Sequence, residues 1–203
     1  HDKQAYGQGL VDAVAAGLKA RGIEPVIVEG VNKGQSDFSA LITKLKNTNV
    51  DFVYWGGFHP EAGAILRQGA DQGFKPVFMG ADGVDNADLF AIAGDAAEGV
   101  LATVPMDFSA DPKNAAIVEA IKAKKQDPNG PFVMPAYSAV QVLAEAANRS
   151  KSDDPDTVAK ELRKGEYETA IGKIAFEENG DLKDFHSVVY ELHADGRKIL
   201  KSQ

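Results

Sequence analysis

The sequence contains 203 residues, of which 44% are hydrophobic and 26% are charged, the composition of an ordinary globular protein. Its net charge of −8 and pI near 5.0 argue against nucleic-acid binding, which needs a basic surface. No apolar run approaches the roughly 20 residues of a membrane-spanning helix. The absence of cysteine excludes disulfides and thiolate chemistry but leaves the cellular compartment open.

The first half of the chain alternates between helical and strand-like patterns. Helices are expected over residues 7–21, from Ser36 or Asp37 to 45, from Pro60 to 73, and from Asp85 or Asn86 to 92. Strands are expected over residues 24–31, 50–55, 76–81 and 99–104. Each is a nearly continuous apolar run, which is typical of strands buried on both faces. This rhythm predicts an α/β fold in which helices cover both faces of a parallel sheet.

After Pro105 the pattern becomes mainly helical. Further helices are expected from Asp111, from about Pro135 to Arg149, and from Asp154. Two hairpin-like stretches then follow, because Asn-Gly and Asp-Gly are strong turn signals between alternating residues. The first joins residues 173–176 to Leu182, and the second joins residues 188–192 to Ile199.

Asp82 is the sharpest candidate for a functional residue. It ends the apolar run 76–81 and is followed by Gly83. In an open parallel sheet, ligands sit outside the carboxyl ends of the strands. A carboxylate in such a cleft needs a cationic partner or hydrogen-bond donors to remain charged. Asp82 is therefore either the counter-ion of an ammonium group or the cap of a turn.

Three other candidates lie at comparable positions. Gly56 and Gly57 either let the backbone approach a ligand walled by Phe58 or make a tight strand-to-helix turn. Tyr6, at the start of a helix, either contacts the ligand or has an ordinary surface or core position. Trp55 is expected in the core.

The sequence offers little for catalysis or metal binding. The four histidines, His1, His59, His186 and His193, lack the spacing of metal ligands. His59 is expected at the N-terminus of a helix. No motif joins a nucleophile to a base, and no complete dinucleotide or phosphate-binding motif is present. We therefore expect a protein that is not an enzyme and that has no cofactor or metal.

Several segments together resemble the periplasmic branched-chain amino-acid-binding proteins, the leucine/isoleucine/valine receptors of ABC transporters. They extend over essentially the whole chain: residues 1–10, 51–61, 78–84, 91–99, 122–128 and 178–183. The resemblance implies two α/β lobes that clamp an amino acid in the cleft between them. Residues 1–105 and 186–203 would form the second lobe, and residues 106–185 the returning part of the first lobe, whose sheet is missing. The chain would begin just after the first strand of the second lobe.

The resemblance also implies roles for single residues. Asp82 would bind the α-ammonium group, and Tyr6, Phe58 and Phe132 would border the ligand. Asp82 is one methylene shorter than the family's usual glutamate, and Phe58 lacks the hydroxyl of the tyrosine in the best-known members. These departures extend the expected ligands from leucine, isoleucine and valine to smaller or differently shaped amino acids. Because first-lobe groups hold the α-carboxylate in this family, we expect the chain alone to bind weakly.

The function expected from this resemblance is that of an extracytoplasmic, periplasmic solute-binding protein. It would deliver a free aliphatic L-amino acid to an ABC permease in the membrane, with no nucleic-acid partner. The alternative is a ligand-sensing domain of the same fold within a receptor or regulator. An enzyme is the third class, with Asp82 and His59 as its only candidate groups.

Overall fold

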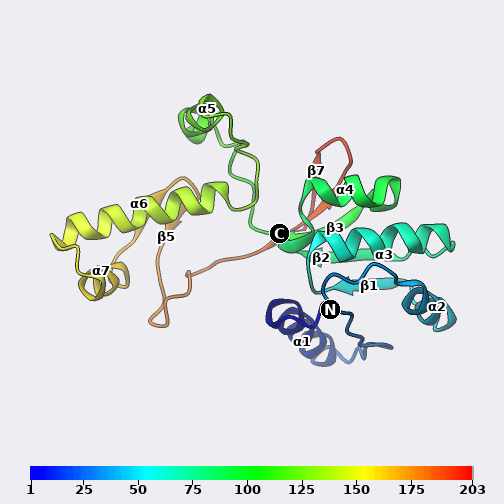
Figure 1. Ribbon diagram of the computed structural model, residues 1–203. Helices are drawn as coiled ribbons and strands as arrows, with labels where there is room; N and C mark the ends of the chain where they lie inside the picture. The colour runs from blue at the N-terminus through cyan, green and yellow to red at the C-terminus, as the bar shows by residue number, and fades with distance from the viewer. Residues whose placement is uncertain (203) are drawn as a thin grey trace. The chain divides into compact units, whose positions relative to one another are not determined.

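The computed structural model describes residues 1–202, and the chain divides into two compact units (Figure 1). Unit 1 comprises residues 1–104 and the chain from Val188 onward, and unit 2 comprises residues 105–187. Within the described residues, no helix is both long enough and apolar enough to cross a membrane.

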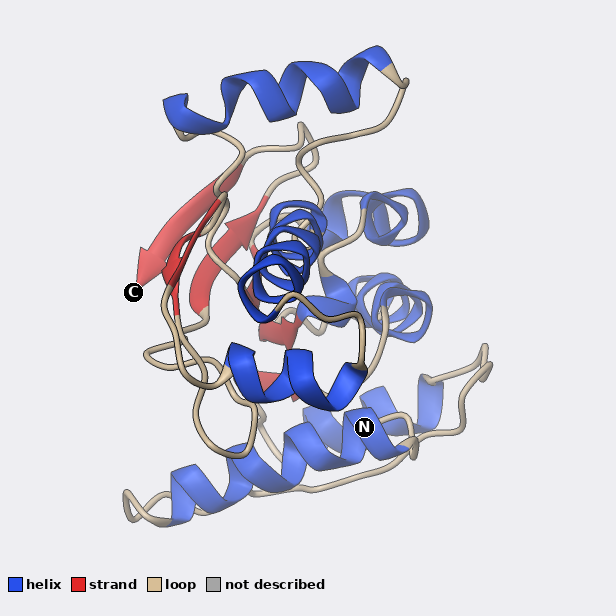
Figure 2. Ribbon diagram, turned by 90° about the vertical axis from the view of Figure 1, so that its left-hand side faces the viewer, coloured by secondary structure: helices blue, strands red, loops and turns tan. Residues whose placement is uncertain are grey.

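A five-stranded sheet forms the centre of unit 1, and its strands run side by side (Figure 2). The strand order is β1-β2-β3-β6-β7. β1, β2 and β3 are parallel, whereas β6 and β7 form the expected hairpin and join antiparallel. The sheet is therefore mixed and not purely parallel. The strands are β1 (Phe52–Trp55), β2 (Val77–Ala81), β3 (Val100–Val104), β6 (Val188–Leu192) and β7 (Lys198–Ser202).

The expected helices of unit 1 are present with small shifts at their ends. They are α1 (Ala5–Lys19), α2 (Ser39–Asn47), α3 (His59–Asp71) and α4 (Ala87–Ala93), with short 3₁₀ turns η1 (Asp82–Val84) and η2 (Gly94–Ala97). The Asn86 side chain caps α4 by accepting a hydrogen bond from the Asp88 N–H. Phe38, Ile42 and Leu89 are fully buried, so the apolar faces of α2 and α4 contribute to the core.

The strand expected over residues 24–31 is absent, and that prediction was wrong. The segment is irregular, and the Val26 and Val28 side chains are 71% and 57% exposed. Its ordered contacts lie at one end, where the Val31 N–H donates to the His1 carbonyl (2.8 Å) and the His1 amine donates to the Glu29 carbonyl (3.0 Å). Apolar, β-branched composition favours a strand only where a neighbouring strand completes the ladder.

Unit 2 is helical around a short hairpin. Its elements are η3 (Pro112–Asn114), α5 (Ala115–Ala123), α6 (Val133–Ser150), α7 (Pro155–Leu162), β4 (Tyr167–Thr169) and β5 (Gly172–Ile174). Asp111 and Asp154 cap η3 and α7, as their place before proline predicts. The expected pairing of Phe176 with Leu182 occurs as a single bridge, whereas the hairpin of β4 and β5 was not predicted.

The core of unit 2 is small. It gathers four buried residues: Val142, Ala146, Val158 and Tyr167. The Tyr167 hydroxyl donates to the Glu161 carbonyl at 3.0 Å, and the Arg149 guanidinium lies 4.5 Å from the centre of the tyrosine ring.

Candidate functional site

Asp82 lies directly after β2, at the carboxyl end of the parallel strands. Its Oδ1 accepts a hydrogen bond from the Tyr6 hydroxyl at 2.8 Å, and the same hydroxyl accepts one from the Gly83 N–H at 3.3 Å. Burial raises the pKa of Tyr6, and the bond to Asp82 raises it further. Tyr6 therefore keeps its proton and remains a donor to the carboxylate. The structure brings together two residues that are 76 positions apart in the sequence.

Phe58 completes an aromatic wall beside this pair. Its ring centre lies 5.2 Å from that of Tyr6, with the two planes tilted by 30°. The Phe58 side chain is 41% exposed, so one part of it is free for contact with a ligand. The site thus combines a half-buried carboxylate with an accessible apolar surface.

Gly56 and Gly83 allow three segments to meet at the site, the third of them carrying Gly57. A Cβ atom at Gly56 would lie 2.2 Å from the Gly7 carbonyl oxygen, which belongs to the first turn of α1. A Cβ atom at Gly83 would lie 2.4 Å from the Gly57 carbonyl oxygen. Side chains at these positions would separate the start of α1, the turn after β1 and the η1 turn. The close approach of backbones is therefore visible, and contact of these glycines with a ligand remains a prediction.

Sequence reasoning missed Tyr54 as a neighbour of Asp82, and Thr103 as a partner of Tyr54. Burial raises the pKa of the half-buried Tyr54, and the nearby Asp82 charge adds to the shift, whereas a hydrogen bond with Thr103 opposes it. Tyr54 comes from β1 and Thr103 from β3, the two strands that flank β2. A polar residue late in each neighbouring strand was the available signal, because these positions share the carboxyl edge of the sheet.

Two expectations for nearby residues are confirmed. Trp55 is buried in the core, and its indole N–H donates to the Phe58 carbonyl at 3.1 Å. His59 is the first residue of α3, as expected for a helix N-terminus. Over residues 1–202, no group of three or more histidine or acidic side chains is placed to hold a metal ion.

Phe132, the remaining predicted ligand contact, belongs to unit 2. It precedes α6 and its side chain is 51% exposed. Its predicted contact with the ligand stays a prediction.

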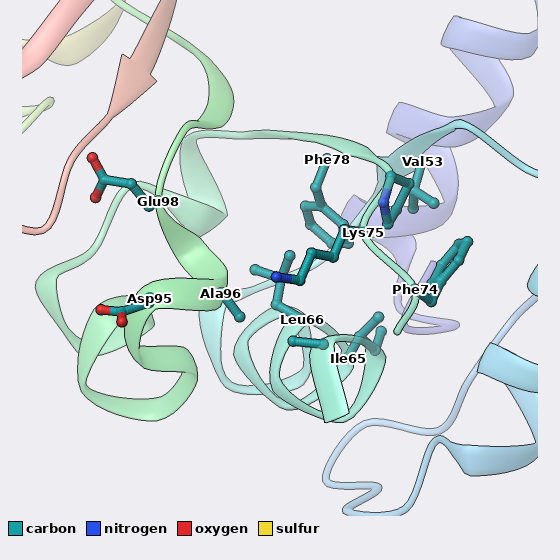
Figure 3. Close-up of a pocket in the computed structure, with 11 residues that line it drawn as sticks. Val53, Ile65, Leu66, Phe74, Lys75, Phe78, Asp95, Ala96 and Glu98 are labelled. Atoms are coloured by element: carbon teal, nitrogen blue, oxygen red, sulfur yellow. The ribbon is translucent and has the colours of Figure 1, made fainter. Parts of the chain in front are cut away.

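A separate hollow of about 380 Å³ lies at the opposite end of the strands of unit 1. Val53, Leu66, Phe74 and Phe78 give it an apolar wall, over which the Lys75 side chain extends (Figure 3). Asp95 and Glu98 lie on the side away from Phe74 (Figure 3). Glu98 already accepts hydrogen bonds from His193 and from the Ala194 N–H, so it is not free for a ligand.

The geometry around Asp82 suits binding more than catalysis. The Asp82 carboxylate has one oxygen held by the Tyr6 hydroxyl, the ring of Phe58 packs against that tyrosine, and the Asp82 charge contributes to raising the pKa of Tyr54. Such a group attracts an ammonium ion and orients it through the fixed position of the tyrosine. The aromatic wall offers apolar contact to the rest of a small ligand.

Comparison with known proteins places the chain in a family. The model of the "Periplasmic binding protein" family matches residues 1–196. The chain belongs to this family. It is 50% identical over 198 residues to the leucine-, isoleucine-, valine-, threonine- and alanine-binding protein of Pseudomonas aeruginosa, covering 98% of the chain and 53% of that protein. It is 48% identical over 196 residues to the Leu/Ile/Val-binding protein of Escherichia coli, covering 97% of the chain and 53% of that protein.

A solved structure supports the same fold. The leucine-binding protein of Thermotoga maritima superposes with a TM-score of 0.86 at 30% identity, covering 98% of this chain and 57% of that one. The predicted α/β fold of the periplasmic-binding-protein type is thus confirmed. The chain spans about half the length of the relatives it matches. Both relatives are named as amino-acid-binding proteins.

Proposed function

We propose that the protein carrying this chain is a periplasmic solute-binding protein that binds a free aliphatic L-amino acid and delivers it to an ABC permease. The observation that carries the proposal is the Asp82 carboxylate, which ends a strand at the binding edge of the sheet and is oriented by Tyr6 at 2.8 Å. Its charge is the counter-ion of the ligand's ammonium group. The aliphatic side chain lies against the ring of Phe58, with Phe132 of unit 2 as a further apolar contact.

The similar proteins support this ligand class. One relative is named for binding leucine, isoleucine, valine, threonine and alanine, and the other for leucine, isoleucine and valine. The short Asp82 side chain and the missing hydroxyl at Phe58 favour the broader of these two ranges. We therefore expect alanine and threonine to be bound as well as the branched-chain amino acids.

The exposed apolar surface of unit 2 supports an incomplete lobe. On α6, Tyr137, Val140 and Leu143 are 42%, 67% and 52% exposed and recur at a spacing of three residues. The core-forming residues of the same helix lie at a spacing of four on another side, including Val142 and Ala146. A helix that is apolar on two sides is usually packed on both. We propose that unit 2 is the returning part of a first lobe, and that the sheet of this lobe covers the exposed side.

The free edge of β1 supports a further strand in unit 1, which we propose is the second lobe. β1 is an edge strand on which Phe52 is exposed, and Ile23, Val26 and Val28 are exposed in the irregular segment after α1. The backbone of residues 1–2 already joins these two segments, because the Asp2 N–H donates to the Gly56 carbonyl (3.0 Å) while His1 bonds to Glu29 and Val31. A further extended strand between these two segments would complete the sheet and give residues 24–31 the partner they lack.

A binding protein is favoured over the two alternatives. The relatives are named as amino-acid-binding proteins, which does not favour a sensing domain of a regulator. An enzyme would need a nucleophile or an acid–base pair at Asp82. The side-chain hydrogen bond to Asp82 comes instead from the hydroxyl of Tyr6, and the pKa of the Tyr54 hydroxyl is raised by the nearby Asp82 charge.

Calorimetry on the complete protein tests the proposal. Titration with leucine, valine, threonine and alanine should show binding, and Asp82→Ala should weaken it roughly a hundredfold because a buried charge pair is broken. Asp88→Ala is the matched control, since this carboxylate is 73% exposed on α4. Equal affinity in the wild type and the Asp82→Ala variant would contradict the role of Asp82. Absence of binding by every amino acid would contradict the function.

A further inference from the structure

An ion pair ties the last strand of unit 1 to the turn that carries Asp82. The Lys198 ammonium at the start of β7 lies 2.7 Å from Oδ2 of Asp85. Asp85 follows the η1 turn, and the two residues are 113 positions apart in the sequence. The Asp85 side chain is only 6% exposed, and that of Lys198 is 24% exposed. A carboxylate this deeply buried requires a compensating charge, and Lys198 supplies it.

The carboxylate of Asp85 is not used to cap the following helix. That role belongs to Asn86, whose side chain accepts the Asp88 N–H at 2.8 Å. The backbone of Asp85, in contrast, closes the η1 turn, because its N–H donates to the Asp82 carbonyl at 3.1 Å. A displacement of Asp85 would therefore be transmitted directly to Asp82.

The η1 turn is held at three points. Tyr6 bonds to Asp82 and to the Gly83 N–H at its beginning. Val84, fully buried, packs so closely over Gly80 that a Cβ atom there would lie 2.7 Å from the valine methyl group. The ion pair of Asp85 is the third point, and its lysine is fixed by the ladder of β7 with β6.

We propose that Lys198 is a positioning residue for ligand binding: through Asp85 it fixes the η1 turn and thereby the direction of the Asp82 carboxylate. The proposal rests on the function proposed above, in which Asp82 binds the ligand's ammonium group. A charge-assisted bond loses strength when its geometry is poor, so a small shift of the turn reduces affinity without removing any group that touches the ligand.

Lys198→Met in the complete protein tests the proposal. This variant leaves the Asp85 charge buried and unpaired, and we expect the affinity for leucine to fall about tenfold. Adding Asp85→Asn removes the unpaired charge and should recover most of the loss, because both partners of the pair are then neutral. Lys201→Met is the matched control, since Lys201 lies on the same strand but pairs with Glu191 at 2.9 Å.

A readout without ligand separates positioning from stability. The amide resonance of Gly83 reports on the bond to Tyr6, and we expect it to shift in Lys198→Met and to stay unchanged in Lys201→Met. A lower melting temperature with unchanged leucine affinity and an unchanged Gly83 resonance would overturn the proposal. Lys198→Arg keeps the positive charge, so the leucine affinity and the Gly83 resonance should both stay at their wild-type values. If the wild type bound no amino acid, the proposed function would fail, whereas the Gly83 resonance would still decide whether Lys198 positions the turn.

Discussion

Units 1 and 2 differ in the size of their sheets and in how far the apolar faces of their helices are buried. Unit 1 has a continuous five-stranded sheet with buried residues on α2, α3 and α4. Unit 2 has a two-stranded hairpin, a small core, and helix α5 without a single buried residue. The comparison shows that a strong helical pattern forms α5 without any buried residue and α6 with only one of its two apolar sides packed.

The two units also differ in how firmly they hold the candidate ligand-binding residues. Asp82 is held by a turn whose neighbours all belong to unit 1, so its geometry is complete within that unit. Phe132 precedes α6 in the less complete unit and has a half-exposed ring. The sheet of unit 1 thus positions the carboxylate of Asp82 and the ring of Phe58, whereas the role of Phe132 in ligand binding stays a prediction.

The largest expected effect comes from the core of unit 2. Tyr167→Ala removes a fully buried ring and should destabilise unit 2 by about 3–5 kcal/mol, enough to unfold a small core. Trp55 is the single tryptophan and lies in unit 1, so its fluorescence should keep the wild-type urea midpoint while circular dichroism shows an earlier transition. Leu89→Ala, in the core of unit 1, should move the fluorescence transition. If the fluorescence and circular-dichroism transitions shifted together in both variants, the two units would unfold as one.

A smaller effect is expected at the site itself. Tyr6→Phe removes the hydroxyl that donates to Asp82 and accepts from Gly83. Hydrogen bonds to charged groups contribute roughly 1.5–3 kcal/mol, so leucine affinity in the complete protein should fall about tenfold or more. Tyr137→Phe removes a hydroxyl from α6 that has no place in the proposed site, and should leave the affinity unchanged. An unchanged leucine affinity in Tyr6→Phe would show that the bond from Tyr6 to Asp82 is not needed for ligand binding.

The smallest expected effect is the acid sensitivity of unit 1. The hydrogen bond from His193 lowers the pKa of Glu98 below its ordinary value of 4.5. The stabilisation of the folded state by the Glu98 carboxylate is therefore present above pH 4.5. It is lost as the pH falls through the lower pKa that Glu98 has in the folded state. Urea midpoints from Trp55 fluorescence should fall less steeply below that pH in Glu98→Gln than in the wild type. Glu166→Gln, which breaks an ion pair with Lys173 in unit 2, should leave the fluorescence midpoints unchanged.

The sequence predicted those helices and strands that are marked by residues close together in the chain. The strands β1, β2 and β3 and most helices follow from apolar periodicity and from caps such as Asp111, Asn86 and Asp154. The segment 24–31 has the composition of a strand but no partner, and composition alone cannot reveal a missing neighbour. The hairpin of β4 and β5 was missed because its two strands are too short to show alternation.

The sequence located several candidate site residues through local patterns, and their contact with a ligand stays a prediction. Asp82, Phe58 and the glycines stand at strand ends, which the sequence marks by a change from apolar to polar or glycine residues. Tyr54 and Thr103 lie on the two strands that flank β2, and the order and register of a sheet are not visible in one sequence. The ion pair of Lys198 and Asp85, which spans 113 positions, needed the structure.

One measurement tests the central claim most directly: the affinity of the complete protein for leucine and for 4-methylpentanoate, the same molecule without its ammonium group, in the wild type and in Asp82→Ala. If Asp82 binds the ammonium group, the wild type prefers leucine strongly, and the substitution removes roughly a hundredfold of affinity for leucine but little for the analogue. If Asp82→Ala weakened both ligands equally, or if the wild type bound them equally well, the assignment of Asp82 would be wrong.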